Sequence, residues 1–198
     1  MKRLAAFFVA ASLPLAVTAA PESYTIDPLH TYPQFEVDHL GYSKMRGRFD
    51  GTTGKFTIDR QAKAASLELS VPTKTVTTGD EARGPRPRSR DEHLRTPDFL
   101  NAAEFPAMTY KATKVSFKGE DPALIEGQLT LLGVTKPVPL KVENWKCGPD
   151  PRTKGQKQMC GANATGSIKL TDFGIKFGVP VFIGDELKLW IELEAYKD

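Results

Sequence analysis

The chain has 198 residues, with 27 lysines and arginines against 24 aspartates and glutamates, so its formal net charge is only +3. A balance this close to neutral provides no electrostatic attraction to nucleic acid, and we expect no nucleic-acid partner. Hydrophobic residues make up 40% of the chain, and this length suits one domain with a substantial core.

Residues 1–19 have the pattern of a secretory signal peptide. A short basic start precedes an apolar stretch over residues 4–17, and small residues surround the expected cleavage point after Ala19. The stretch is shorter than the roughly 20 apolar residues of a membrane span, and no later run approaches that length. We therefore predict an exported, periplasmic protein that does not span the membrane. The mature domain would cover residues 20–198, and a retained N-terminal anchor is the alternative.

The first part of the mature chain alternates apolar and polar residues with a period of two. Over residues 65–71, alanine, leucine and valine at odd positions alternate with serine and glutamate. This pattern is typical of a strand with one buried and one wet face. We predict strands near 33–39, 45–59 and 65–71.

The next segment breaks the alternation. Residues 90–101 are polar and helix-prone. The acids Asp91 and Glu92 lie at the expected N-terminus of the helix, where the helix dipole is positive. They predict a short helical connection with a Phe-Leu pair turned inward, and such connections often lie near the function of a β-protein. The preceding residues 83–89 are basic. They fit a solvated loop tip, or a rim that faces a phosphorylated lipid headgroup or an anionic membrane.

Alternation returns after residue 105 and predicts strands near 106–118, 125–131 and 138–142. In the first of these the phase shifts between Ala112 and Val115, which indicates a β-bulge. Cys147 and Cys160 then flank a polar, turn-rich stretch. In an oxidising compartment this isolated pair favours a structural disulfide that closes a loop. A redox-active pair is the alternative, although it would prefer a C-x-x-C spacing.

The last part of the chain predicts strands near 166–170 and 187–195, separated by an unusual connection. Residues 174–183 are apolar and do not alternate. An apolar loop of this kind can cover an apolar cavity or form a subunit contact. The whole set gives about eight one-sided strands, which favours antiparallel pairing. Eight such strands can close into a barrel or stack as a sandwich, and periodicity alone does not separate the two.

Catalytic and metal-binding motifs are scarce. The chain has no G-x-S-x-G, no H-E-x-x-H and no glycine-rich phosphate loop. Its three histidines, His30, His39 and His93, are scattered, and each is more often a local hydrogen-bonding residue than a metal ligand. We predict no catalytic residue, no metal and no cofactor.

An ordered set of short motifs nevertheless resembles the YceI-like family of exported bacterial lipid-binding proteins. The resemblance covers the mature chain from Tyr24 to Tyr196. Its motifs are Ile26–Thr31, Phe35–Gly41, Met45–Phe49, Gly54–Phe56, Arg90–Leu94, Pro97–Leu100, Glu104–Pro106, Gly127–Val138, Thr171–Ile175 and Leu187–Ala195. The basic stretch 83–89 and the loop between the cysteines depart from the family pattern.

The resemblance implies an all-β fold, an eight-stranded antiparallel lipocalin-like barrel with a short helical connection. It also implies a long apolar cavity for a polyisoprenoid or similar amphiphile, and it leaves a homodimer open, because family members often pair. An eight-stranded barrel has about the interior needed for one small ligand.

From the inward parity of the strands we expect ten residues to line this cavity: Phe35, Phe49, Phe56, Leu67, Leu69, Met108, Tyr110, Leu129, Leu131 and Phe177. A polar headgroup would lie near the mouth, where His30, Arg90 or His93 offers donors. The predicted mechanism is sequestration or carriage of the lipid, driven by removal of its apolar surface from water. An enzyme that acts on such lipids, or a ligand-free structural barrel with a filled interior, are the alternatives.

Overall fold

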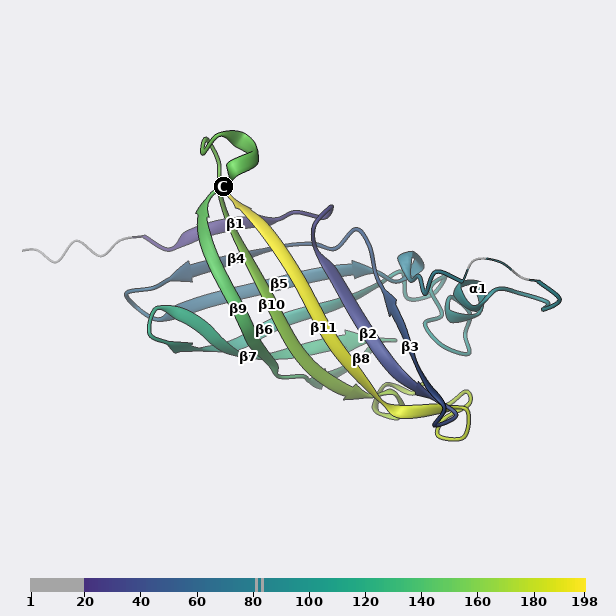
Figure 1. Ribbon diagram of the computed structural model, residues 1–198. Helices are drawn as coiled ribbons and strands as arrows, with labels where there is room; N and C mark the ends of the chain where they lie inside the picture. Colours follow the sequence, from purple (N-terminus) through teal and green to yellow (C-terminus); the bar gives the residue numbers. More distant parts are fainter. Residues whose placement is uncertain (1–19, 81, 83) are drawn as a thin grey trace, which may run out of the picture.

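The computed structural model describes residues 20–80, 82 and 84–198, so the predicted signal peptide lies outside the described residues. Over the described residues, the fold is an antiparallel sheet of eleven strands with one short α-helix and three 3-10 turns (Figure 1). The strands are β1 (Glu22–Ile26), β2 (Tyr32–His39), β3 (Ser43–Arg48), β4 (Thr53–Asp59), β5 (Ala64–Pro72), β6 (Ala107–Lys118), β7 (Asp121–Leu131), β8 (Val134–Pro137), β9 (Leu140–Pro149), β10 (Gln158–Lys169) and β11 (Ile183–Lys197). The helical elements are η1 (Thr73–Thr75), α1 (Arg90–Leu94), η2 (Pro151–Thr153) and η3 (Leu170–Phe173).

Eight of the strands close into a barrel in the order β1-β4-β5-β6-β7-β9-β10-β11, and β11 pairs back with β1. In this closing pair of strands, Tyr24 lies opposite Lys197 and Ile26 lies opposite Ala195. The closed ring confirms the predicted barrel and excludes the sandwich. Closure also removes the free strand edges that an open sheet would expose.

The hairpin of β2 and β3 extends the barrel wall beyond this ring. Strand β11 is fifteen residues long, and its last residues pair with β1 while its middle pairs with β2. The outer strand of the hairpin, β3, is joined to the segment before α1 by two hydrogen bonds of 2.9 Å between the backbones of Arg48 and Thr77. The hairpin therefore lies on the same side of the molecule as α1 (Figure 1).

Several predicted strand limits were wrong for identifiable reasons. The predicted strand 45–59 is two strands, because the chain turns through Gly51, whose φ is +70°, between β3 and β4. The strand near 138–142 begins at Leu140, since Pro137 and Pro139 cannot donate to the ladder. Strands β1 and β8 were missed. The predicted bulge is confirmed by a register shift between Ala112 and Lys114.

The predicted disulfide is present. Cys147 on β9 and Cys160 on β10 are direct cross-strand partners with Cα atoms 4.0 Å apart. The loop that they close contains η2 and lies well apart from α1 (Figure 1). The fully buried Asp150 fixes this loop, because its carboxylate accepts hydrogen bonds from Tyr196 and from Arg152.

The predicted helical connection is also present, as α1, and its start is held by a capping box. The Ser89 side chain accepts a hydrogen bond of 3.1 Å from the Glu92 amide, and the Glu92 carboxylate accepts one of 2.7 Å from the Ser89 amide. Asp91, one of the two acids expected at the polar start of this helix, is buried and only 1% exposed. Its carboxylate accepts hydrogen bonds from Thr77 and Thr78, which tie α1 to the segment after β5.

No described helix is long and apolar enough to cross a membrane.

Candidate functional site: an apolar cavity in the barrel

The barrel encloses a cavity of about 570 Å³ between its strands, the α1 connection and residues 174–183. Its lining is mostly aliphatic and aromatic. A cavity of this size and character is typical of sites for small apolar ligands. Eight of the ten residues predicted to line a ligand cavity contribute to it: Phe35, Phe49, Leu69, Met108, Tyr110, Leu129, Leu131 and Phe177.

The structure does not place Phe56 and Leu67 in this cavity. Both line a separate cavity of about 60 Å³ further along the barrel. Phe56 stacks on Tyr24 with ring centroids 4.6 Å apart and meets Trp145 edge to face at 5.6 Å. These aromatic contacts make Phe56 part of the core that fills the barrel away from α1.

Three rings line the large cavity where the α1 connection meets the connection before β11, and they contact one another. His93 and Phe99 come from the α1 connection, and Phe177 comes from the apolar connection before β11. Each ring meets the other two edge to face or steeply inclined, with centroid distances of 5.0, 4.9 and 5.5 Å. We call His93, Phe99 and Phe177 the aromatic seam, because it joins two connections that are not linked to each other by strand pairing.

An acidic residue, Asp98, contacts the polar edge of the His93 ring in the aromatic seam. The Asp98 carboxylate lies 2.8 Å from Nε2 of His93 and accepts a hydrogen bond of 3.1 Å from Arg88. The hydrogen bond with His93, followed by that from Arg88, holds the pKa of Asp98 below its ordinary value. Asp98 therefore stays ionised and orients the imidazole of His93 in the cavity lining.

Two arginines reach the cavity lining beside the seam. Arg86 makes two hydrogen bonds of 2.8 Å to Asp80, and a guanidinium nitrogen of Arg90 lies 3.4 Å from the same carboxylate. Arg86, with Arg90 adding a smaller effect, lowers the pKa of Asp80. Each guanidinium at the mouth is thus matched to a carboxylate of this chain.

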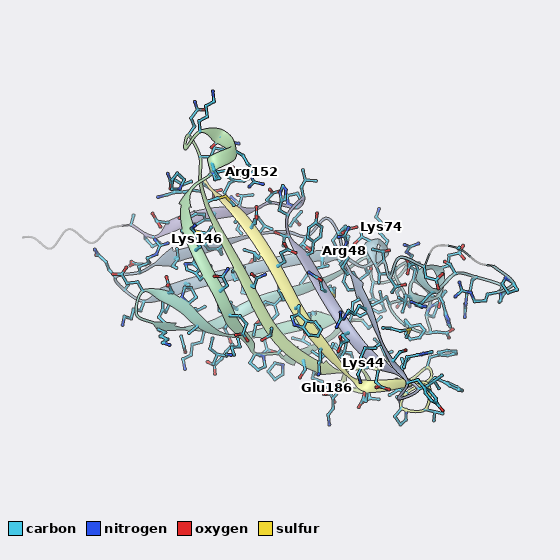
Figure 2. The ribbon with its side chains drawn as sticks, viewed as in Figure 1. Lys44, Arg48, Lys74, Lys146, Arg152 and Glu186 are labelled. Carbon is cyan, nitrogen blue, oxygen red and sulfur yellow. A yellow bond between two sulfur atoms is a disulfide. The ribbon has the colours of Figure 1, made fainter. Side chains whose placement is uncertain are left out.

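His30 lies elsewhere. Its Nδ1 is 2.7 Å from Asp27, and its Nε2 is 3.4 Å from a guanidinium nitrogen of Arg152. Figure 2 shows Arg152 at the loop that contains η2, away from α1. The structure therefore brings Arg90 and His93 to the mouth of the cavity but not His30.

His30 belongs to the one group among the described residues whose ligand atoms are close enough for a metal ion. Oxygen or nitrogen atoms of Asp27, His30 and Glu194 lie within 4.8 Å of one another. The guanidinium of Arg152 already contacts this group, at 3.1 Å from Glu194. A positive side chain occupies the place that a cation would take, so the cluster is an ion-pair network that fixes the η2 loop.

Proteins of a known family resemble this chain in sequence and in architecture. A family model described as a YceI-like domain matches residues 24–195. The chain belongs to the YceI-like family. A UPF0312 protein of Pseudomonas aeruginosa is 37% identical over 199 residues, covering 99% of this chain and 98% of the relative. A protein named YceI from Escherichia coli is 40% identical over 164 residues, covering 81% and 80%.

Solved structures agree with the YceI-like fold. The Campylobacter jejuni YCEI protein has a TM-score of 0.63 at 25% identity, covering 81% of this chain and 90% of that one. BcnA of Burkholderia cenocepacia has a TM-score of 0.65 at 16% identity, covering 85% and 98%. A structure described as a polyisoprenoid binding domain from Saccharophagus degradans has a TM-score of 0.60 at 15% identity, covering 88% and 98%.

Some lining residues of this YceI-like domain were missed from the sequence. Leu187, Leu189 and Ile191 of β11 line the large cavity, and they are the same odd positions whose alternation predicted the strand. Parity marked them as inward, but it did not tell a packed core from a hollow one. Phe182 and Arg86 lie on connections that were expected near the cavity, residues 174–183 and 83–89, but neither was named as a lining residue, because no periodicity applies there.

Proposed function

We propose that this YceI-like protein binds an isoprenoid-type or fatty-acyl amphiphile in its large cavity and sequesters or carries it. The observation that supports this is an apolar cavity of about 570 Å³ inside the barrel, lined at one end by the three rings of the aromatic seam. Transfer of a hydrocarbon chain into such a cavity gains roughly 25 cal/mol for each Å² of apolar surface removed from water. One protein of the same fold is described as a polyisoprenoid binding domain, which agrees with this ligand class.

The mouth suits a polar headgroup without charge. Arg90 and Arg86 share Asp80, and His93 contacts Asp98. A phosphorylated headgroup would have to displace one of these carboxylates, whereas a hydroxyl or carbonyl oxygen can accept an additional hydrogen bond from Arg90. We therefore infer an alcohol, phenol or quinone type of headgroup, and the paired Arg86 and Arg88 provide no support for an anion-facing rim.

Binding explains the site better than catalysis does. A histidine that acts as a base needs a nucleophile or a substrate water within hydrogen-bond reach. Among the described residues, the ring contacts of His93 are Asp98, Phe99 and Phe177. Asp98 contacts the polar edge of the ring while Phe99 and Phe177 pack against it, so the His93–Asp98 pair orients the seam.

Export to the periplasm is part of the proposal. It rests on the signal-peptide pattern of residues 1–19 and agrees with the Cys147–Cys160 disulfide, because such bonds persist in oxidising compartments. Cell fractionation combined with N-terminal sequencing tests it. We expect the protein in the periplasmic fraction with its first residue at 20, and an uncleaved cytoplasmic chain would contradict export.

We also propose that two copies of this protein pair. The turn after β2 and the connection before β11 are joined by a hydrogen bond of 3.0 Å from the Leu40 amide to the Phe182 carbonyl. Together they expose Tyr42, Val181 and Phe182, which are 92%, 71% and 58% exposed. An apolar tip of this kind suits a subunit contact. Light scattering tests it: we expect a dimer that Tyr42→Ser with Val181→Ser converts to monomer.

Native mass spectrometry followed by organic extraction tests the binding function. Protein purified gently from the envelope should carry an amphiphile, and the extracted protein should take up an added prenyl alcohol. Leu189→Gln, which places an amide in the cavity lining, should abolish uptake, while Lys188→Gln on the neighbouring outward position should not. A protein that carries nothing and takes up nothing would refute the proposal.

A further inference from the structure

The two cavities of the barrel share one layer of side chains. Along β5, β11 and β9 with the residues just before it, successive inward positions follow the same order along the barrel. Val71, Leu189 and Val138 line only the large cavity, and Leu67, Leu193 and Val142 line only the small one. The residue between them on each strand lines both, and these residues are Leu69 on β5, Leu140 on β9 and Ile191 on β11. We call these three residues the partition.

The partition is held in place by its neighbours. The buried hydroxyl of Tyr110 donates a hydrogen bond of 2.9 Å to the carbonyl of Val138, two residues before Leu140. Leu140 also packs against Gly166, where a Cβ would lie 2.9 Å from the Leu140 side chain. The backbone of β9 is therefore fixed at this level, and the leucine fills space that a larger residue at position 166 would take. The partition is part of the packed wall and not a flexible loop.

The small cavity lies beyond the partition and holds only about 60 Å³. Its far side contains the Phe56–Trp145 pair and the stack of Phe56 on Tyr24. A hydrocarbon chain that enters from the seam meets the partition first. It reaches the small cavity only if a partition side chain is absent or displaced.

We propose that the partition determines the longest apolar chain that this protein accepts. The inference rests on the proposed function and adds a rule of specificity to it. A ligand whose apolar chain fits between the aromatic seam and the partition buries more apolar surface with every added carbon. A longer chain leaves its excess carbons at the mouth, in contact with water, so further length adds no affinity. Removing one partition side chain joins the small cavity to the large one and moves this limit to longer chains.

The experiment measures the affinity of the delipidated full chain for linear prenyl alcohols of increasing length. For the wild type, affinity should rise with length and then level off at one chain length. In Leu140→Ala, the first alcohol beyond that limit should bind about tenfold more tightly or better than it binds the wild type. Leu131→Ala is the matched control, because Leu131 and Leu140 are both 5% exposed and Leu131 lines only the large cavity.

Two further variants keep the test decisive. Ile191→Ala removes a different partition residue and should move the limit in the same direction even if Leu140→Ala does not fold. Ala164 lines the small cavity, so Ala164→Leu added to Leu140→Ala should refill that space and restore the wild-type limit. Such restoration would show that the added length occupies the small cavity.

The outcomes separate the proposal from the function on which it rests. An equal shift in Leu131→Ala and Leu140→Ala would overturn the partition as the determinant, because total volume would then set the limit. Affinity that rises without levelling off in the wild type would overturn the partition alone. A protein that binds no prenyl alcohol of any length, and no fatty acid, would overturn the proposed function and the partition with it.

Discussion

His93 and Phe177 meet edge to face with ring centroids 4.9 Å apart, and this contact joins the α1 connection to the connection before β11 directly over the large cavity. Both residues line that cavity. On the proposed function, we expect an amphiphile that enters from solvent to part this contact or the neighbouring contact of Phe177 with Phe99. The aromatic seam would then govern the rate of exchange more than the affinity.

The first prediction concerns Phe177→Ala. The change removes both aromatic contacts that Phe177 makes, which are together worth about 1–2 kcal/mol, so a bound prenyl alcohol should dissociate about tenfold faster. Stopped-flow release of an anthraniloyl-labelled prenyl alcohol into lipid vesicles measures this rate. Lys176→Ala is the control, because Lys176 is exposed next to Phe177 on the same connection and does not line the cavity. An unchanged rate in Phe177→Ala would show that exchange uses another route.

The second prediction concerns Asp91→Asn. The buried carboxylate accepts three hydrogen bonds from Thr77 and Thr78, and an amide cannot accept all of them. We expect a loss of about 2 kcal/mol in the free energy of unfolding, because buried donors lose their partners. Urea unfolding measures it, and Asp121→Asn at an exposed site should cost almost nothing. Equal stability of the two variants would mean that Asp91 does not anchor α1.

Much of the barrel could be predicted from the sequence because period-two alternation reports which face of a strand is buried. The same alternation placed Leu69 and Leu129 correctly in the large cavity but also placed Phe56 there, since parity gives the face of a strand and not the depth along the barrel. The Asp98–His93 contact and the position of His30 depend on how connections pack against one another. Alternation carries no information about that packing.

The third prediction concerns the disulfide. Replacing Cys147 and Cys160 together by serine opens the loop that contains η2, which the loop-entropy model values at about 3 kcal/mol. We expect this loss in urea unfolding without a change in the affinity for a prenyl alcohol, because neither cysteine lines the large cavity. The wild type under reducing conditions should approach the variant. A fall in affinity at intact fold would contradict the separation of this loop from the cavity.

The fourth prediction concerns the pairing of β1 with β11, which closes the barrel. Asp198 accepts hydrogen bonds from Thr25 and Ser23 and lies 3.2 Å from the ammonium group of Lys55. The hydrogen bonds from Thr25 and then Ser23 are the main causes that lower the pKa of Asp198 from 3.8 to about 2. Protonation of this carboxylate removes the contacts that bind the end of β11 to β1 and β4.

Because the pKa is lower in the folded chain than in the unfolded chain, the stabilisation by Asp198 is complete above pH 3.8 and is lost as the pH falls towards about 2. Asp198→Asn should therefore be less stable than the wild type at neutral pH, and the difference should shrink between pH 3.8 and about 2. Urea unfolding at a series of pH values measures this convergence. Asp172→Asn, at another exposed acid, should stay close to the wild type at neutral pH. A gap between Asp198→Asn and the wild type that is constant with pH would mean that the carboxylate charge does not hold the barrel closed.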